Sequence, residues 1–389
     1  MNVLFLTHSF PRDEGDAAGS FILRLARALR GEGVNVRVVA PGATGLTAHE
    51  SMDGVEVQRV RYAPRRYETR AYGGNMAEQV RDTWSARFTL VGFLGAEFQA
   101  GVHAKREFNP DLVHAHWWFP NGLAATWVAR MAGIPLVTTL HGTDVRMARN
   151  ISVSRPAFRH VIRHSAAVTA VSRWLSAEAQ SVVSMQPPIV APMPVATDLF
   201  APAASGGRQR RLLFVGRLMP QKGIDLLIEA LAQLPDDIGL DIVGDGPDRS
   251  ALAARAASLG LTDRVTFHGA VKQPALAVFY QRALALVVAS AEEGLGLVAV
   301  EAQLCETPVV AFDSGGLPDV VQHDRTGILV RERSAAALAA AIRSMLERED
   351  LGAELGAAGR LHALATFAPE SVARTYANVY RSVIGSGAT

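Results

Sequence analysis

Arg211-Leu-Leu-Phe-Val215 restarts, in the second half of the chain, the pattern with which the first half begins. The run predicts a buried strand, and Gly223–Leu234 predicts the helix that follows it. Near the N-terminus the strand run Val3–Leu6 is likewise followed by a helical stretch from about Gly19 to Arg30. Repetition of strand, turn and helix is typical of a parallel sheet wrapped by helices.

The alternation continues through both halves of the chain. Further apolar runs predict strands at 36–39, 112–116, 136–140 and 167–171, and then at 240–243, 265–268, 285–289, 308–312 and 327–330. Segment 191–207 is rich in Pro, Gly and Ser and lacks periodicity, so it predicts a linker. We therefore expect an α/β protein with two doubly wound, Rossmann-like domains, 1–190 and 208–368, and a cleft between them in which ligands meet the carboxyl ends of strands.

Composition limits the compartment and the class of partner. The only cysteine, Cys305, excludes an internal disulfide and fits a reducing compartment. The first residues carry no basic flank, and no run approaches the roughly 18–20 apolar residues of a membrane span, so we expect a cytoplasmic protein. The net charge of +2 is too balanced to favour nucleic acid as a partner.

The charge is unevenly distributed. Residues 1–190 carry 21 Arg+Lys and 15 Asp+Glu (21 − 15 = +6), whereas residues 191–389 carry 18 and 22 (18 − 22 = −4). Part of the excess lies in five arginines interleaved with Tyr62 and Tyr67, namely Arg59, Arg61, Arg65, Arg66 and Arg70. A solvated loop is one interpretation. The other is a patch for an anionic acceptor or for peripheral contact with an acidic membrane surface.

Two glutamates and two cations suggest a phosphate-and-polyol ligand. Glu293 and Glu301 bracket a Gly-x-Gly turn that leads into an apolar helix. Amide groups at a helix N-terminus attract phosphate, and carboxylates accept hydrogen bonds from hydroxyls. Arg217 and Lys222 follow the strand at 211–215, and Lys222 is one of three lysines in the chain. We expect these two cations to bind a diphosphate.

Other nucleotide and metal motifs are absent from the sequence. There is no Gly-x-Gly-x-x-Gly fingerprint after a strand and no Walker loop. No Asp-x-Asp occurs, so fixed cations would stabilise a leaving diphosphate. His114 and His116 share one face of a predicted strand and could bind a metal, but satisfied polar positions fit them better because no third ligand has suitable spacing.

The motifs together resemble family 4 of the retaining glycosyltransferases, which have the two-domain GT-B fold. The resemblance covers nearly the whole chain. It is strongest in four segments: Val-Gly-Arg-Leu-x-x-x-Lys-Gly from Val215, Val-Gly-Asp-Gly-Pro from Val243, Glu-Gly-Leu-Gly-Leu-Val-Ala-Val-Glu-Ala from Glu293, and Gly-Gly-Leu-Pro-Asp-Val-Val from Gly315.

The resemblance implies roles for particular residues. Arg217 and Lys222 would bind the donor diphosphate, Glu293 the donor sugar and Glu301 the ribose. His141 would lie near the transferred sugar, which makes Glu293, His141, Arg217 and Lys222 the catalytic candidates. Further donor contacts would come from Gly294, Leu295, Gly296, Leu297, Val298, Val271 and Gly19. Candidates on the acceptor side are Gly15, Asp16, His116, Arg65 and Arg66. The final helix, in 369–389, would pack back on the first domain.

Two departures from the family pattern concern acceptor and donor contacts. The N-terminal loop has Gly15-Asp-Ala-Ala-Gly19 where a double glycine is frequent. Asp319 stands in place of a usual glutamate, and Leu295 in place of a common phenylalanine. Neither change removes a group that the chemistry needs.

The sequence therefore predicts transfer of a sugar from a nucleoside diphosphate to a hydroxyl of a saccharide, lipid-linked or small-molecule acceptor, with retention of configuration and without a metal or other cofactor. Two alternatives remain open: a nucleotide-sugar epimerase or hydrolase of the same fold, and a non-catalytic nucleotide-binding partner subunit. The sequence identifies neither the base nor the sugar, and it leaves the oligomeric state open.

Overall fold

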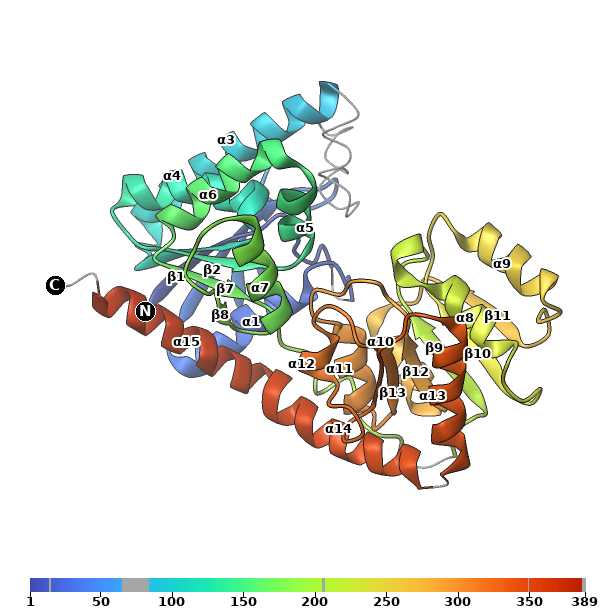
Figure 1. Ribbon diagram of the computed structural model, residues 1–389. Helices are drawn as coiled ribbons and strands as arrows, with labels where there is room; N and C mark the ends of the chain where they lie inside the picture. The colour runs from blue at the N-terminus through green and yellow to red at the C-terminus, as the bar shows by residue number, and fades with distance from the viewer. Residues whose placement is uncertain (14, 65–83, 205–206, 349, 387–389) are drawn as a thin grey trace. The chain divides into compact units, whose positions relative to one another are not determined.

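The computed structural model describes residues 1–13, 15–64, 84–204, 207–348 and 350–386. The described chain divides into two compact units (Figure 1). Unit 1 comprises 1–194 together with 369–389, and unit 2 comprises 195–368. Both units are α/β structures built on a mostly parallel sheet, as the sequence predicted. No helix in the described part of the chain is long and apolar enough to cross a bilayer.

Unit 1 contains an eight-stranded sheet with the order β3-β4-β2-β1-β5-β6-β7-β8. The strands are β1 (Asn2–Leu6), β2 (Asn35–Pro41), β3 (His49–Met52), β4 (Val55–Val60), β5 (Leu112–His116), β6 (Leu136–Leu140), β7 (Ala167–Ala170) and β8 (Ile189–Val190). Its helices are α1 (Ser20–Leu29), α3 (Trp84–Glu107), α4 (Leu123–Ala132), α5 (Thr143–Asn150), α6 (Arg155–His164), α7 (Arg173–Val182) and α15 (Pro369–Ser386).

Three strand elements of unit 1 were not predicted: β3, β4 and β8. Strand β3 pairs antiparallel with β4, and its four residues alternate between exposed and half-buried positions, so it lacks the apolar run that marks a buried strand. Strand β8 has two exposed residues at the sheet edge, just before the segment expected to be a linker. Strands β3 and β8 are edge strands, which bury little surface and so leave a weak hydrophobic pattern. Strand β4 lies between β3 and β2, and its valines are interrupted by Glu56, Gln58 and Arg59, so it also lacks a continuous apolar run.

The last helix, α15, belongs to unit 1 although the whole of unit 2, residues 195–368, precedes it in the chain. It lies along α1 (Figure 1). Tyr376 and Tyr380 of α15 are fully buried. The Tyr376 hydroxyl donates to the Ala191 carbonyl at 3.0 Å, and the Tyr380 hydroxyl lies 2.8 Å from His114 Nδ1. The buried tyrosines therefore fasten the end of the chain to the first sheet.

Unit 2 contains a six-stranded parallel sheet with the order β11-β10-β9-β12-β13-β14. Its strands are β9 (Arg211–Val215), β10 (Gly239–Val243), β11 (Val265–Gly269), β12 (Ala285–Val288), β13 (Val309–Phe312) and β14 (Ile328–Val330). Its helices are α8 (Ile224–Leu231), α9 (Arg249–Ser258), α10 (Gln273–Arg282), α11 (Leu297–Leu304), α12 (Leu317–Val320), α13 (Ala335–Glu347) and α14 (Leu351–Phe367).

Each sheet reverses its strand order once, and ligands of doubly wound folds bind at the carboxyl ends of the strands at such a reversal. The reversal falls between β1 and β5 in unit 1, and between β9 and β12 in unit 2. Glycines allow the turns of unit 2 to approach closely at this edge. Gly244 has φ +139°, and a Cβ atom on it would overlap the Gly216 carbonyl oxygen.

Candidate functional site

An ion pair occupies the reversal point of the second sheet. Lys222 Nζ lies 2.5 Å from Glu293 Oε1. Lys222 follows β9, and Glu293 follows β12, so the two neighbouring strands bring together residues that are 71 positions apart. Ser290 Oγ also donates to Glu293 Oε1, at 2.7 Å. The side chains are 26% and 15% exposed, which leaves the pair within reach of a ligand.

The backbone around this pair is fixed by glycines and cross-strand bonds. Gly223 has φ +62°, and a Cβ atom there would overlap the Ala289 carbonyl oxygen, so only glycine fits next to Lys222. The Ala291 amide donates to the Gln221 carbonyl at 2.9 Å. The Gly316 amide donates to the Glu293 carbonyl at 2.8 Å. The two turns that carry the ion pair are therefore held by main-chain contacts.

Helix α11 begins directly after the Gly-x-Gly turn. Its N-terminal flanking residue, Gly296, has φ +93°, which a side chain would disfavour. The first amide groups of a helix have no partner within the helix and attract anions. The other predicted donor residues of this segment, Gly294, Leu295, Leu297 and Val298, lie in the same turn and first helical positions. Arg217 is exposed in the turn after β9, and Val271 lies two residues beyond β11.

Glu301 lies deeper than its proposed ribose role suggests. It is 6% exposed on α11, and both of its oxygens already accept hydrogen bonds from α10. Gln273 Nε2 donates to Oε1 at 3.1 Å, and the buried Tyr280 hydroxyl donates to Oε2 at 2.7 Å. Each carboxylate oxygen can accept more than one hydrogen bond, so a contact with a ribose hydroxyl stays a prediction.

In unit 1 the reversal point is surrounded by histidines. His116 Nδ1 and His141 Nε2 are 3.1 Å apart, at the carboxyl ends of β5 and β6. Burial lowers the pKa of His116 to about 3 and the pKa of His141 well below its usual value. His114 lies behind them, bonded to Thr139 and Tyr380. All three side chains are therefore neutral at pH 7.

Asp144 fixes the backbone that carries His141. Asp144 Oδ1 accepts from the amides of His141, Gly142 and Val145 at 2.9–3.1 Å, and Oδ2 accepts from the Trp118 amide at 3.2 Å. Burial raises the pKa of Asp144, and these amide bonds oppose the rise. The segment His141-Gly-Thr-Asp144 is thus a turn that the Asp144 carboxylate stabilises by accepting hydrogen bonds from its backbone amides.

The sequence prediction missed a second group of residues beside these histidines. The Trp117 ring stacks on His141, with centroids 4.1 Å apart and planes 28° apart, and it packs against His8 at 4.5 Å. His8 Nδ1 lies 2.6 Å from Asn121 Oδ1, and Asn121 Nδ2 donates to Glu97. The sequence signal for this group was the position of His8, two residues after the first strand. Glu97 and Asn121 offered none, because neither belongs to a motif and their contact depends on how α3 packs against the segment after β5.

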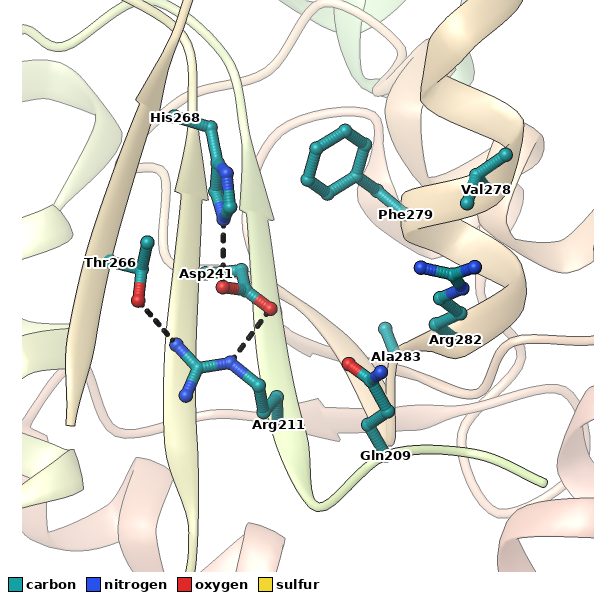
Figure 2. Close-up of a pocket in the computed structure, with 9 residues that line it drawn as sticks. All are labelled: Gln209, Arg211, Asp241, Thr266, His268, Val278, Phe279, Arg282 and Ala283. Carbon is teal, nitrogen blue, oxygen red and sulfur yellow. Dashed lines mark hydrogen bonds and ion pairs between the residues drawn. The ribbon is translucent and has the colours of Figure 1, made fainter.

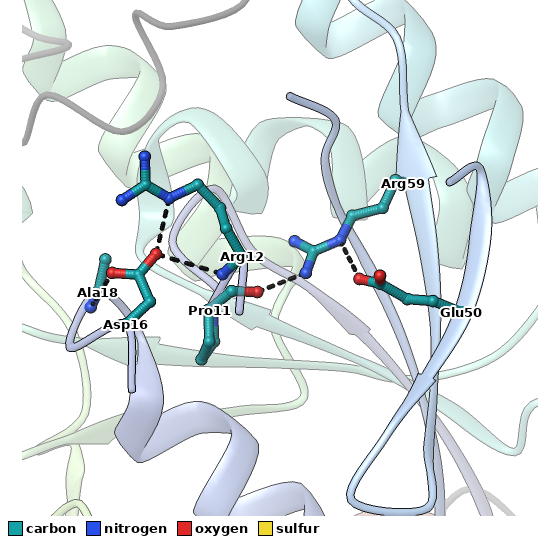
Figure 3. A network of polar contacts seen from close by, with 6 residues as sticks. All are labelled: Pro11, Arg12, Asp16, Ala18, Glu50 and Arg59. Carbon is teal, nitrogen blue, oxygen red and sulfur yellow. Dashed lines mark hydrogen bonds and ion pairs between the residues drawn. The ribbon is translucent and has the colours of Figure 1, made fainter. Parts of the chain in front are cut away.

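The N-terminal loop closes on itself around Asp16 (Figure 3). Asp16 Oδ2 accepts from Arg12 Nε at 2.6 Å, and Oδ1 accepts from the Ala18 amide at 3.1 Å. Burial would raise the pKa of Asp16, but bonds from Arg12 and Ala18 outweigh it and the pKa is lowered. A Cβ atom on Gly19 (φ +70°) would overlap the Ser9 carbonyl oxygen, whereas one on Gly15 would meet open space. Asp16 is thus already engaged within the loop.

Arg59 is not part of a solvated arginine loop, contrary to one interpretation of the sequence. It lies on β4 with 4% exposure, donates from Nε to Glu50 Oε1 at 2.7 Å, and donates to the Pro11 carbonyl (Figure 3). It therefore anchors the N-terminal loop to the β3–β4 hairpin. Arg65 and Arg66, predicted on the acceptor side, lie outside the described residues, as does Arg70.

A recess of about 300 Å³ lies on the sheet face of unit 2, between β9–β11 and α10. Asp241 stands at its centre and binds Arg211 Nε at 2.9 Å and His268 Nε2 at 2.8 Å (Figure 2). Phe279 and Arg282 of α10 form the opposite wall (Figure 2). None of the predicted site residues lines this recess. Within the described ranges, no group of three or more His, Cys, Asp or Glu side chains could hold a metal ion.

The fold and these motifs define a glycosyltransferase of the GT-B class. Residues 196–362 match the family "Glycosyl transferases group 1", and residues 17–195 match "Glycosyl transferase 4-like domain". The chain belongs to the group 1 glycosyltransferases, as its motifs predicted.

The chain is also similar to individual proteins in sequence and in structure. The chain is 32% identical to a D-inositol 3-phosphate glycosyltransferase of Streptomyces scabiei, over 95% of this chain and 87% of the relative. Among solved structures it is similar to a sucrose-phosphate synthase from Thermosynechococcus elongatus (TM-score 0.77, 26% identity, 99% of this chain and 100% of the other). It is also similar to HepE of Anabaena in complex with UDP-glucose (TM-score 0.74, 21% identity, 98% and 100%).

Proposed function

We propose that this glycosyltransferase moves a sugar from a UDP- or GDP-sugar to a hydroxyl of a saccharide, lipid-linked or small-molecule acceptor, with retention of configuration and without a metal ion. The observation that carries the proposal is the Lys222–Glu293 pair at the reversal point of the second sheet. One partner is suited to a phosphate and the other to hydroxyls. A nucleotide-sugar presents both groups side by side.

The departing diphosphate accumulates negative charge, and fixed donors would stabilise it. Lys222, Arg217 and the first amides of α11 supply these donors in the proposal. Before the donor binds, Lys222 is neutralised by Glu293 at 2.5 Å. An incoming diphosphate would attract Lys222 and leave Glu293 free to bind sugar hydroxyls. The ion pair thus holds both side chains in position for the donor.

Retention follows in this proposal from attack on the face that the diphosphate leaves. The proton of the acceptor hydroxyl would pass to the departing phosphate, so no side-chain nucleophile is required. Glu293 would support the positive charge that develops on the sugar. His141 would lie near the transferred sugar as a neutral hydrogen-bonding group, because its pKa is well below the usual value.

Two of the similar proteins bear on the choice of acceptor and donor. The Streptomyces relative carries the name of an enzyme acting on D-inositol 3-phosphate, which supports a hydroxyl-rich acceptor here. HepE was solved with UDP-glucose, but at 21% identity that likeness supports the fold alone, so both UDP and GDP remain in the proposal. The charge of +6 on residues 1–190 (21 − 15) favours an anionic acceptor or one at a membrane surface.

The experiment begins with thermal-shift screening against UDP, GDP and ADP, and then against their sugars. The melting shift grows with the ratio of ligand concentration to dissociation constant, so it ranks the donors. The best donor is then incubated with an acceptor panel in EDTA, and NMR determines the anomeric configuration of the product. We expect a retained product at an undiminished rate.

Four other results of this experiment would each contradict one part of the proposal. An inverted product would contradict the mechanism, and loss of activity in EDTA would contradict metal independence. Donor consumption without an acceptor would identify a hydrolase or epimerase. Nucleotide binding without turnover on any acceptor would indicate a non-catalytic subunit.

A further inference from the structure

His8 lies two residues after the end of β1, at the reversal point of the first sheet. Its side chain is partly exposed. Its Nδ1 lies 2.6 Å from Asn121 Oδ1. The amide nitrogen of Asn121 donates to Glu97 Oε1, and both Asn121 and Glu97 are fully buried. With its NH2 group directed at Glu97, Asn121 presents only an oxygen to His8. In this orientation of the Asn121 amide, His8 Nδ1 carries the proton, which leaves the lone pair on Nε2.

The Nε2 atom of His8 is open to a ligand. Among the described residues, Nε2 has no hydrogen-bond partner. The atom is not fully buried, so a ligand can reach it. His116 Nε2, by contrast, is buried and without a partner in the same part of the chain. The Trp117 ring, 4.5 Å away, keeps the His8 imidazole in place.

The surroundings keep His8 neutral. Burial lowers its pKa to about 4, and the bond to Asn121 only partly opposes this. The titratable groups that face it are His116 and His141, whose pKa values burial also lowers, and Glu97 behind Asn121, whose pKa burial raises to about 8. All of them are uncharged at pH 7. A neutral imidazole with a free lone pair binds a hydrogen-bond donor and disfavours a phosphate or carboxylate oxygen.

We propose that His8 Nε2 accepts a hydrogen bond from a hydroxyl of the sugar acceptor, and that Asn121 and Glu97 are positioning residues that fix the His8 tautomer. This inference rests on the proposed function. The reacting hydroxyl gives its proton to the departing phosphate, so His8 binds a neighbouring hydroxyl and sets the orientation of the acceptor. His8 is thus a specificity-determining residue, and its ligand is an uncharged polyol face.

The tautomer is tested first, by nitrogen-15 NMR of the full-length protein with labelled histidine. His8→Gln identifies the His8 signals by their disappearance. We expect a protonated Nδ1 and an unprotonated Nε2 in the wild type from pH 6 to 8, and a mixture of tautomers in Asn121→Leu. A wild-type His8 that carries its proton on Nε2 would overturn the proposal.

The hydroxyl contact is tested by two substitutions of His8. A glutamine amide lies as many bonds from Cα as Nε2 does, whereas an asparagine amide lies as many bonds away as Nδ1. His8→Asn should raise the KM for the acceptor about tenfold, the usual effect of one lost hydrogen bond. His8→Gln should restore most of that loss. The melting shift caused by UDP or GDP should equal that of the wild type in both variants, and the exposed His49→Gln serves as a control.

Asn121→Asp gives a readout that a purely structural role would not affect. A carboxylate next to Nδ1–H favours the imidazolium, so the pKa of His8 should rise towards neutrality. Protonated Nε2 cannot accept a hydrogen bond, so the acceptor KM of this variant should increase as the pH falls from 8 to 6, while that of the wild type stays constant. The double variant His8→Gln/Asn121→Asp should lose this pH dependence.

The possible failures are distinguishable. If the wild type transfers no sugar to any acceptor, the proposed function is contradicted, and so is an acceptor contact for His8. Normal transfer in the wild type, with an unchanged acceptor KM in His8→Asn, would remove only the role of His8. Coincident pH profiles of wild type and Asn121→Asp would contradict the positioning role.

Discussion

The reversal points of the two sheets carry opposite chemistry. In unit 2, a lysine and a glutamate lie 2.5 Å apart beside the N-terminus of α11. In unit 1, the corresponding edge carries His8, His116 and His141 around Trp117, and burial keeps the three histidines neutral. One fold can thus provide a charged edge suited to a diphosphate and an uncharged edge suited to hydroxyls. This division fits the proposed transfer from an anionic donor to a hydroxyl of the acceptor.

Lys222→Ala tests the charged edge and should have the largest effect. It removes the cation proposed to stabilise the leaving diphosphate and leaves the Ser290 hydroxyl as the hydrogen-bond partner of the Glu293 side chain. Loss of one such donor typically lowers kcat about 10²–10³-fold. Initial rates with the best donor would measure the loss, and the matched control is Lys105→Ala, at a half-buried lysine of unit 1 whose amine bonds Asn109 at the surface. A loss below about threefold, with the melting temperature unchanged, would assign the charge stabilisation to other groups.

Gly223→Ala tests whether the backbone beside Lys222 is as constrained as its geometry indicates. The residue has φ +62°, and the added methyl group would overlap the Ala289 carbonyl. A left-handed backbone costs a non-glycine residue about 1–2 kcal/mol, and the overlap adds to this. We expect a loss of about 2–3 kcal/mol in the free energy of unfolding, measured in urea.

Gly352→Ala is the control for that substitution. Gly352 lies in α14, where the nearest atom to an added methyl group is Pro308 Cγ at 3.8 Å. Alanine should stabilise this helix by about 0.5–1 kcal/mol relative to glycine. Equal effects of the two substitutions would show that the turn at 223 can relax, and that the ion pair is less firmly held than proposed.

The neutral edge of unit 1 predicts a loss of stability in acid. A histidine of the unfolded chain binds a proton near pH 6.5, whereas folded His116 does so only near pH 3. Between these values the unfolded state binds more protons, so the free energy of unfolding falls as the pH falls through this window. His116 alone should contribute a loss of about 2 kcal/mol between pH 6.5 and 5. His114 and His141, whose pKa values burial also lowers, add in the same direction. Glu97, whose pKa burial raises to about 8, opposes one of these histidines, because its folded form holds a proton that the unfolded chain releases, so the net change remains a loss.

Tryptophan fluorescence can report this loss for unit 1 separately. All five tryptophans lie between residues 84 and 174, and so within unit 1. Urea unfolding followed by tryptophan emission should show a midpoint that decreases from pH 7 to pH 5. A midpoint that is constant over this range would mean that the folded state binds as many protons as the unfolded chain, and that burial does not keep this edge neutral in acid.

The two edges also differ in how much the sequence revealed. The charged edge could be predicted because its residues lie in short contiguous motifs, each at the end of an apolar strand run, as Lys222 and Glu293 do. The two doubly wound domains followed from the same runs, with boundaries correct to within a few residues for most buried strands, and the resemblance to the glycosyltransferase family implied the GT-B fold. The pairing of Lys222 with Glu293 required only that β9 and β12 be neighbours.

The neutral edge could not be predicted in the same way. Glu97, Asn121 and His8 come from three separate segments and belong to no shared motif, and their contacts depend on how α3 packs against the segment after β5. Arg59 has the residue type of a surface loop, but the structure buries it between Glu50 and Pro11. Hydrophobic periodicity identifies which elements form. It does not identify which polar side chains meet when those elements pack.

A matched pair of tyrosine substitutions provides the finest test of the comparison. Tyr280→Phe removes a hydroxyl that donates to the buried Glu301 carboxylate at 2.7 Å, and Tyr380→Phe removes one that lies 2.8 Å from the neutral His114. Both rings are fully buried, so the hydrophobic contribution is the same. A hydrogen bond to a charged group contributes about 1.5–3 kcal/mol, and one between neutral groups about 0.5–1.5.

We therefore expect Tyr280→Phe to lower the free energy of unfolding by about 1 kcal/mol more than Tyr380→Phe does, in urea titrations at pH 7. If Glu301 also binds the ribose, Tyr280→Phe should change the nucleotide-induced melting shift as well, because the carboxylate then has one bond fewer to hold its orientation. Tyr380→Phe should not. Equal losses in the two variants would mean that Glu301 is no more charged than His114, and the contrast between the two units would then be confined to the Lys222–Glu293 pair.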